Sequence, residues 1–352
     1  MENSRNPIRG RGSSDNPVNR FEGHYVDYDP DEGTGQRPSQ DTRLIRDDTK
    51  NILSVNNSPD IPFNVSINPY RGCEHGCIYC YARPTHEFLG FSSGLDFESR
   101  IMVKYDAPEK LRKQLASPKW EPQVIVMSGV TDPYQPIEKE LEITRGCLKV
   151  LAEFRNPVGI ITKNYLVTRD MDLLGELANY QAAHVTLSIT TLDRKLARIM
   201  EPRTSQPNRR LKAIEELASR GISVGVNVAP IIPGLTDHEC VSILEAAREA
   251  GASYAGYTLI RLPYGVKDLF EQWLEQHVPE RKEKVLNRIR DMRGGKLNDS
   301  RYGERFRGKG TYVQQIKDLF SVHSKRLGFN QRTGALSTRA FRPAHGRQMD
   351  LF

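Results

Sequence analysis

The chain has 352 residues, 38% of them hydrophobic, and a formal net charge of +7. This length allows a large core within one barrel-type domain, and five cysteines are too few and odd in number for a disulfide framework. No apolar run reaches the roughly 18 residues of a membrane span, and the first residues lack the apolar stretch of a secretory signal, so we expect a cytoplasmic protein.

The positive charge is concentrated in the last part of the chain. Residues 281–352 contain 18 Lys and Arg against 6 Asp and Glu, a balance of +12, so residues 1–280 carry the remaining −5. A segregated basic segment is typical of proteins that bind a phosphate backbone. We therefore predict that basic residues in 281–347 contact DNA. The alternative is a solvated, positively charged helical face without a particular partner.

Residues 1–58 are rich in Asn, Asp, Gly, Ser and Arg and show almost no apolar periodicity. Such a segment buries too little apolar surface to offset the entropy lost on ordering. We predict a mostly disordered N-terminal segment, part of which settles against the folded domain.

Residues 59–278 alternate short apolar strands with amphipathic helices. Strands are predicted at 63–67, 123–128, 158–162, 184–189, 223–228 and 254–260, and helices at 108–116, 138–154, 169–179, 206–220, 237–250 and 266–277. This alternation favours an α/β domain with parallel strands and right-handed crossovers. By periodicity alone, a doubly wound sheet, an eight-unit barrel and a six-unit barrel all fit.

The remaining residues form two further predicted regions. Residues 279–338 read as a basic helical appendage, with helices at 279–292 and 311–327 around a connector rich in Gly, Lys and Arg. Residues 339–352 read as a flexible tail.

Three cysteines, Cys73, Cys77 and Cys80, follow the first predicted strand at C-x3-C-x2-C spacing. Three thiolates on one loop can hold three corners of a [4Fe–4S] cluster and leave the fourth iron without a protein ligand. A structural zinc site needs four ligands, and the sequence contains no second C-x2-C pair, although His75 lies on the same loop. We predict that the three cysteines bind a cluster.

This loop and the strand before it resemble the signature of the radical S-adenosylmethionine (SAM) superfamily. The run Cys77–Tyr81, followed by Ala-Arg, is similar to the branch that contains spore photoproduct lyase (DNA repair photolyase-like). The resemblance covers about residues 60–265. It implies a partial (β/α)6 TIM-type barrel, a [4Fe–4S] cluster and S-adenosylmethionine as cofactors, a 5′-deoxyadenosyl radical, and an electron donor such as flavodoxin or ferredoxin.

Functional groups of a parallel α/β barrel gather at the carboxyl ends of its strands. After the second predicted strand, the turn with Ser128, Gly129, Thr131 and Asp132 resembles the superfamily segment that holds the amino group of the cofactor. A small-residue turn also lets backbone carbonyls approach an ammonium closely. The alternative is an ordinary Asp-Pro turn.

The later strands supply further candidates. Ser188 and Thr190 share one face of the fourth strand and suit hydrogen bonding to ribose. The resemblance places Glu201 and Arg203 near the carboxylate and sugar of the cofactor, with surface salt bridges as the alternative. Lys163, at the end of the third strand, is a candidate contact for a carboxylate or substrate phosphate, or a partner of a neighbouring acid.

Three more residues complete the predicted cofactor site. Tyr79 lies on the cysteine loop, and Asn227 is expected to face inward from the fifth strand. The segment after this strand resembles the superfamily segment that flanks the adenine, which implies that Ile232 packs against the base. From the sixth strand, Tyr257 or Arg261 is expected to reach toward the substrate.

Spore photoproduct lyase uses an additional cysteine after the second strand as hydrogen-atom donor, and the corresponding turn of this chain contains no thiol. Tyr134 and Tyr257 are the candidate donors instead. Cys147 and Cys240 lie at helical spacing and are predicted to be small buried residues.

The last five residues, Gln-Met-Asp-Leu-Phe, resemble the motif by which bacterial replication and repair enzymes dock on the sliding clamp. Leu351 and Phe352 would enter an apolar pocket, while Gln348 makes the orienting polar contact. The alternative is that these apolar residues pack into the core.

The main hypothesis is a radical SAM enzyme, lyase-like or transferase-like, that repairs or modifies a base of DNA. One alternative keeps the radical chemistry but acts on RNA, a peptide or a metabolite. The other is a non-catalytic iron–sulfur protein associated with DNA.

Overall fold

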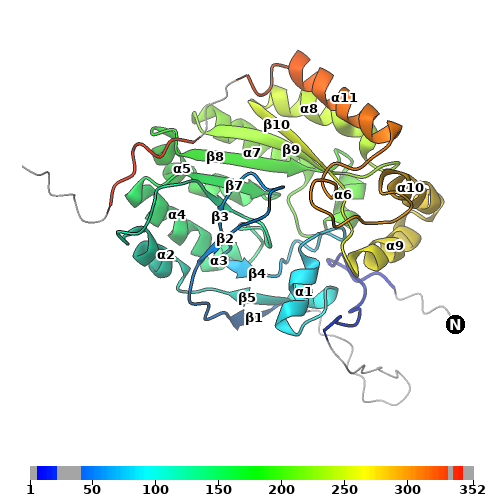
Figure 1. Ribbon diagram of the computed structural model, residues 1–352, viewed down its shortest axis with the longest axis horizontal. Helices are drawn as coiled ribbons and strands as arrows, with labels where there is room; N and C mark the ends of the chain where they lie inside the picture. Colours follow the sequence, from blue (N-terminus) through cyan, green and yellow to red (C-terminus); the bar gives the residue numbers. More distant parts are fainter. Residues whose placement is uncertain (1–5, 22–40, 332–335, 344–352) are drawn as a thin grey trace, which may run out of the picture.

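A seven-stranded sheet organises this computed structural model, which describes residues 6–21, 41–331 and 336–343 (Figure 1). Its order is β10-β9-β8-β7-β6-β3-β2. The strands are β2 (Leu53–Val55), β3 (Val65–Ile67), β6 (Ile125–Met127), β7 (Val158–Thr162), β8 (Ala183–Ile189), β9 (Ser223–Ile231) and β10 (Tyr254–Leu259). All neighbours pair in parallel except β2, which runs antiparallel to β3.

This order confirms the predicted six parallel strands and selects among the three architectures. From β3 to β10 the parallel strands follow one another in chain order, whereas a doubly wound sheet reverses its order at a switch point. The strands at its two edges, β10 and β2, are not paired with each other in the described residues. The fold is therefore a partial barrel of the (β/α)6 type.

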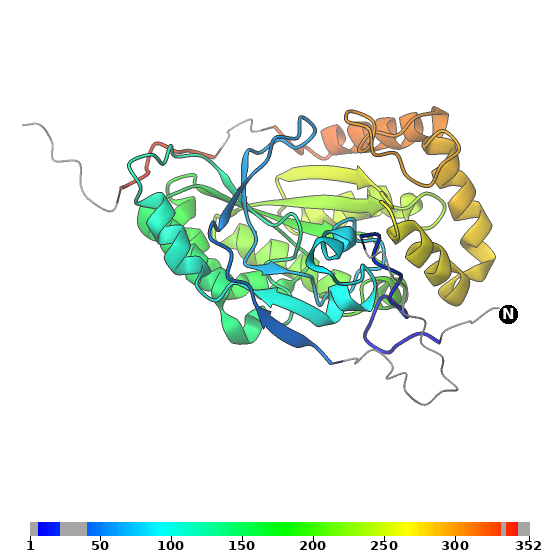
Figure 2. The same ribbon diagram turned by 60° about the horizontal axis from the view of Figure 1, so that its bottom comes forward.

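Helices cover the outer face of this sheet in both views (Figures 1 and 2). On α4, four residues at helical spacing, Cys147, Leu148, Leu151 and Phe154, are buried against the core. Cys240 is likewise buried on α8, as predicted. The helices of this layer are α2 (Ala107–Leu115), α3 (Glu138–Leu141), α4 (Ile143–Phe154), α5 (Met171–Ala178), α6 (Arg194–Met200), α7 (Pro207–Ser219) and α8 (Cys240–Glu249).

The single helix predicted for residues 138–154 is divided in the structure. Glu142 has a positive φ of 51° and separates α3 from α4. The carboxylate of Glu138 accepts hydrogen bonds from the amides of Thr144 (2.9 Å) and Arg145 (3.3 Å), and so caps the first turn of α4. A cap provided from the preceding helix is a tertiary feature that helical periodicity does not reveal.

A second, three-stranded sheet supports the cysteine loop. Its order is β1-β5-β4, with β1 (Arg43–Arg46), β4 (Tyr70–Arg71) and β5 (Arg100–Val103). Apolar periodicity does not predict these strands, because each has only two to four residues. β1 and β2 lie in the stretch for which we predicted no regular structure, so that prediction is corrected over residues 43–55. The short helix α1 (Leu95–Ser99) precedes β5.

Residues 11–16, here called the N-terminal strap, lie against α1 and the cysteine loop (Figures 1 and 2). The amides of Gly12 (3.0 Å) and Ser13 (2.8 Å) donate to the carboxylate of Glu98, and the amide of Leu95 donates to the carbonyl of Asp15 (3.0 Å). This part of the N-terminal segment settles against the domain, as predicted, through specific polar contacts.

The basic appendage begins beyond the carboxyl ends of β9 and β10, and its last helix runs back beside α8 and β10 (Figure 1). After α9 (Val266–His277) come α10 (Pro279–Met292) and α11 (Thr311–Arg326), close to the predicted bounds. The Arg293 side chain donates to the carbonyl of Ile260 (3.0 Å) and so joins the end of α10 to the end of β10. No helix in the described residues is both long and apolar enough to cross a membrane. The predicted clamp motif lies outside the described residues.

Candidate active site at the carboxyl ends of the strands

The cysteine loop is held by a buried arginine. Arg83 is fully buried, and its guanidinium donates to the carbonyls of Gly76 (3.2 Å) and Cys77 (3.0 Å), to those of Ser93 and Gly94, and to the carboxylate of Glu98 (2.5 Å). Charged hydrogen bonds of this kind are among the strongest in proteins. The loop backbone is therefore fixed before any ligand binds.

The three cysteines are free thiols, with Cys73 and Cys77 buried and Cys80 partly buried. Burial is the main cause that raises the pKa of each thiol. Thiolates in this setting need a cationic partner, such as the irons of a cluster. A cluster requires only one cysteine per iron, and three cysteines on one loop can hold three of its four irons. The loop thus fits a [4Fe–4S] cluster.

The loop after β6 lies directly beside the cysteine loop. The hydroxyl of Tyr81 donates to the carbonyl of Gly129 (2.9 Å), and that of Thr131 donates to the carbonyl of Gly72 (2.6 Å). Ser128 and Gly129 have positive φ values of 153° and 132°, and for a non-glycine residue such a conformation is uncommon and often marks a functional site. The predicted residues Ser128, Gly129 and Thr131 are thus brought to the cysteine loop.

The carboxylate of Asp132 makes its contacts with other groups of the protein. Its carboxylate accepts hydrogen bonds from the hydroxyl of Thr162 (2.7 Å) and the amides of Lys163 (2.8 Å) and Tyr134 (2.9 Å), and lies 3.3 Å from Nδ1 of His75. Burial acts to raise the pKa of Asp132, but His75 and the hydrogen bonds outweigh burial and lower it. In this structure Asp132 joins three loops, so its predicted contact with an ammonium stays a prediction.

His75 was the alternative fourth ligand of a zinc site. Its Nδ1 faces Asp132, and its Nε2 lies 3.2 Å from the side-chain nitrogen of Asn164. Both ring nitrogens therefore contact side chains outside the cysteine loop.

Tyr79, Thr190 and Glu201, three predicted cofactor residues, meet in one buried network. The hydroxyls of Tyr79 and Thr190 contact the carboxylate of Glu201, the second at 2.6 Å. Arg210 forms an ion pair with Glu201, and Nζ of Lys163 lies 3.8 Å from it. Burial acts to raise the pKa of Glu201, but these two cations lower it to about 2. Glu201 is ionised and holds the cysteine loop to β8.

Arg210 was not predicted, although the sequence carries a signal for it. Arg210 occupies the buried face of α7 together with Ala213, Ile214 and Leu217, at the spacing of one helical face. A charged residue on an apolar face requires a buried partner. The position of Arg210 on this face predicts that it has a buried acidic partner, but does not identify that partner as Glu201.

Arg203 turns toward the outer side of the cysteine loop. Its guanidinium lies 3.1 Å from the Glu74 carboxylate, and its amide donates to the carbonyl of His75 (3.3 Å). In this structure Arg203 therefore forms an ion pair, which was the alternative to a role at the cofactor. Its direct contact with the cofactor stays a prediction.

Two predicted polar residues lie opposite each other on adjacent strands. Ser188 of β8 is paired in register with Asn227 of β9, which is paired with Gly256 of β10. Because side chains at paired positions share a face, these residues form one polar patch of the sheet. Ile232 is fully buried, and its amide N–H donates to the hydroxyl of Thr236 (3.0 Å); its contact with adenine stays a prediction.

The two candidate hydrogen donors do not join this group. Tyr134 is fully buried, and its hydroxyl donates to Asp170 (3.0 Å) at the start of α5. The ring of Tyr257 lies 4.6 Å from that of Phe320 on α11, and Tyr257 faces away from the side of Gly256 because neighbours on a strand alternate. The structure therefore brings neither tyrosine to the Ser188–Asn227 face.

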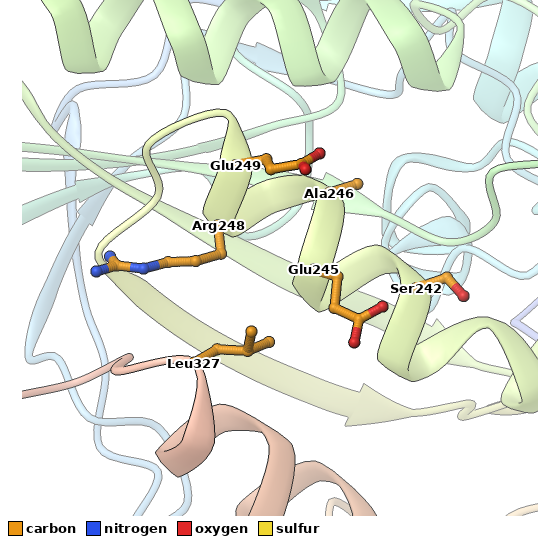
Figure 3. A pocket seen from close by; sticks show the side chains of 6 residues that line it. All are labelled: Ser242, Glu245, Ala246, Arg248, Glu249 and Leu327. Atoms are coloured by element: carbon orange, nitrogen blue, oxygen red, sulfur yellow. The ribbon is translucent and has the colours of Figure 1, made fainter.

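Two surface hollows lie outside this site. The larger, about 560 Å³, lies between α8 and the end of α11 (Figure 3). Its lining mixes Glu245 and Glu249 with Arg248, whose guanidinium already donates to the carbonyl of Ala252 (3.1 Å). The smaller, about 420 Å³, lies between α10 and the loop after β9 and is lined by Gly234, Asp237, His238, Arg281, Lys284 and Arg288.

Known proteins share both the sequence and the fold of this region. The Radical SAM superfamily profile matches residues 67–247, just over half of the chain. An uncharacterized protein of Mycobacterium tuberculosis is 34% identical over 243 residues, which cover 68% of this chain and 70% of that protein. The radical SAM Nalpha-GlyT isomerase of Pseudomonas phage M6 is 27% identical over 173 residues, covering 49% and 34%.

The structure of spore photoproduct lyase complexed with dinucleoside spore photoproduct has a TM-score of 0.56 at 17% identity, covering 81% of this chain and 80% of that one. This similarity shows a shared fold. With the sequence match, it confirms the predicted barrel and the cofactor pair of a [4Fe–4S] cluster and S-adenosylmethionine. The chain belongs to the radical SAM superfamily and is an enzyme.

Proposed function

We propose that this enzyme abstracts a hydrogen atom from a DNA nucleotide in the cytoplasm, in lesion repair or base modification. Cys73, Cys77 and Cys80 hold the cluster. On one-electron reduction, S-adenosylmethionine bound to the cluster supplies a 5′-deoxyadenosyl radical. A ferredoxin or flavodoxin is the proposed electron donor.

The protein contributes binding and orientation at the strand ends. Lys163 donates to the carbonyl of Ala229 (2.9 Å) and remains partly exposed, so its ammonium is placed to attract the carboxylate of the cofactor. Ser188 and Asn227 present the hydroxyl and amide for the ribose. Gly129 offers a backbone carbonyl for the amino group.

The observation that carries the nucleic-acid part of the proposal is the basic face of α10. Arg281, Lys284 and Arg288 recur every three or four residues and line the smaller hollow beside Gly234. Within the described residues, Lys284 and Arg288 have no carboxylate at ion-pair distance. Three cations on one helix face, close to the strand ends, provide the electrostatic surface that a phosphate backbone needs.

By what their names state, one neighbour in fold supports a nucleic-acid substrate and one relative in sequence supports radical chemistry. The neighbour in fold binds a dinucleoside spore photoproduct, and the phage relative is a radical SAM isomerase. The alternative is that the same radical chemistry acts on RNA, a peptide or a metabolite; affinity for DNA that weakens with salt favours the DNA substrate. We further propose that residues 279–338 form one appendage that guides DNA to the barrel of residues 59–278.

Salt-dependent binding tests the DNA surface. The double variant Lys284→Gln/Arg288→Gln should lower the slope of log K against log [salt] on single-stranded DNA by about 1.4, because each lost phosphate contact contributes about 0.7. The control Lys149→Gln/Arg220→Gln removes the same charge from α4 and from the end of α7. Equal slopes for both double variants would show that Lys284 and Arg288 of α10 do not contact DNA phosphates.

A partner for the tail is proposed separately. Residues 348–352, with Gln348, Leu351 and Phe352 as contacts, are proposed to bind the bacterial sliding clamp. Deleting these five residues should abolish heat release on mixing with the clamp in calorimetry. Undiminished binding by the shortened protein would exclude this partner.

A further inference from the structure

Arg261, at the carboxyl end of β10, is a cation without an anionic partner among the residues that the structure describes. It directly follows Ile260, and within the described residues its guanidinium has neither a hydrogen bond nor an ion pair; Nε is buried and unpaired. The guanidinium carbon lies 4.4 Å from the ring centroid of Phe306 and 5.6 Å from that of Tyr81. Stacking on aromatic faces leaves the N–H edge of an arginine available for an anion.

The surroundings of Arg261 are rich in positive charge. Burial, followed by repulsion from Arg305 and then Arg293, lowers its pKa to about 10. Both neighbours are already engaged, since Arg305 pairs with Asp60 at 2.8 Å and Arg293 donates to backbone carbonyls. Of these three guanidinium groups, Arg261 is the one that has no hydrogen bond or ion pair within the described residues, so it is available to bind an anion from a ligand.

The position of Arg261 connects it to the reaction centre. Tyr81 directly follows Cys80, and its hydroxyl donates to the carbonyl of Gly129 (2.9 Å). A single aromatic ring therefore separates Arg261 from both the cysteine loop and the loop after β6. Phe306, on the other side, belongs to the connector between α10 and α11. An anion bound here would lie between the barrel and the appendage.

We propose that Arg261 binds a phosphate of the substrate strand, adjacent to the nucleotide that loses its hydrogen atom. This inference rests on the proposed function. The guanidinium fork matches phosphate geometry, and Tyr81, which is 52% exposed, offers a ring on which an unpaired base can stack. Arg261 would thus act as a binding residue that places the nucleotide at the radical site.

Binding of fluorescein-labelled 12-nucleotide single-stranded DNA to the full-length reconstituted protein tests this role by anisotropy. Arg261→Gln should weaken binding about tenfold or more, because a charged hydrogen bond is lost, and should lower the salt slope by about 0.7. Arg261→Lys should keep the slope but lose part of the affinity, since the fork is absent. The control Arg220→Gln removes the same charge at the exposed end of α7 and should leave both values unchanged.

A purely structural role for Arg261 predicts a different pattern. Both Arg261 variants would then melt at lower temperature while the salt slope stays that of the unaltered protein, which would overturn the proposal. A second measurement uses DNA with one uncharged methylphosphonate at each position in turn. At one position the unaltered protein should lose as much affinity as Arg261→Gln, and the two changes together should cost no more than either alone.

Additive losses at every position would also overturn the inference. Formation of 5′-deoxyadenosine by the unaltered, reduced protein is measured separately and concerns only the proposed radical chemistry. Failure of one test therefore leaves the other interpretable.

Discussion

Among the described residues, charged side chains are paired in one region of the molecule and unpaired in another. The first region surrounds the cysteine loop; the second, here called the rim, comprises Arg261 at the end of β10 and Lys284 and Arg288 on α10. Around the loop, buried charges are paired within the protein, as in Arg83–Glu98 and Arg210–Glu201, and the Asp132 carboxylate contacts the His75 ring. At the rim, Arg261, Lys284 and Arg288 have no such pairs within the described residues. The paired charges fix backbone for a cofactor, whereas unpaired cations remain available for a ligand that arrives from solution.

Removing a paired charge should produce the largest loss of stability. Arg83→Gln leaves Glu98 buried without its cation and should reduce the free energy of unfolding by about 3–5 kcal/mol, measured by anaerobic urea denaturation. Arg112→Gln, in the exposed pair with Glu153, is the control and should cost less than about 1 kcal/mol. Equal losses would show that burial of the pair is unimportant.

Acid should weaken the region around the cysteine loop through His86. Its Nε2 lies 2.9 Å from the carbonyl of Arg100, and burial lowers its pKa from 6.5 to about 4. The unfolded chain therefore binds a proton at higher pH than the folded chain does, so stability falls as pH drops from 6.5 to 4, by about 3 kcal/mol in total. Urea midpoints measured across this range should show the fall, and His86→Gln should remove that part of it. A profile identical in the variant would contradict this assignment.

The N-terminal strap provides a steric test of the same region. A Cβ added to Gly12 would lie 1.8 Å from the carbonyl oxygen of Gly76, so Gly12→Ala must displace the strap, at a cost of about 1–3 kcal/mol. Limited trypsin digestion should cleave the segment faster. Gly175→Ala on α5, where no atom lies within 4 Å, is the control and should slow unfolding or leave it unchanged. Equal protease resistance of both variants would mean that the strap does not depend on this contact.

The rim should show the smallest effect on stability. Lys284→Gln removes an exposed cation that has no ion pair within the described residues, and the free energy of unfolding should change by no more than about 0.5 kcal/mol. Thermal unfolding compared with Arg83→Gln measures the difference between the two regions. If Lys284→Gln lowered the free energy of unfolding as much as Arg83→Gln does, Lys284 would have a partner and the two regions would not differ in how their charges are paired.

Local sequence patterns were sufficient where a structural element depends on its own residues. The run Val158–Thr162 forms β7 with the predicted bounds, and α9 and α10 match their predicted ranges, because apolar periodicity sets which face is buried. The cysteine spacing and its resemblance identified the superfamily. The structure brings three predicted cofactor residues, Tyr79, Thr190 and Glu201, into one network, and their contacts with the cofactor stay predictions.

Long-range partners were beyond local patterns. His75 and Asp132 lie 57 positions apart, and only the approach of two barrel loops brings them together. The two-residue strand β4 has no periodicity of its own and exists because it pairs with β5. The sequence does not determine which face of β10 carries Tyr257, because a shift of one residue in register moves a side chain to the other face. We predicted that Tyr257 faces the substrate, but in the structure its ring packs against Phe320 of α11.

Transfer of deuterium from DNA to the cofactor product tests the account most directly. The reconstituted protein is reduced without oxygen in the presence of S-adenosylmethionine and uniformly deuterated single-stranded DNA carrying thymine lesions or none. We predict 5′-deoxyadenosine that contains deuterium, detected by mass spectrometry and absent when Cys77→Ala replaces the unaltered protein. Formation of 5′-deoxyadenosine without deuterium, at the same rate with and without DNA, would contradict hydrogen abstraction from nucleic acid.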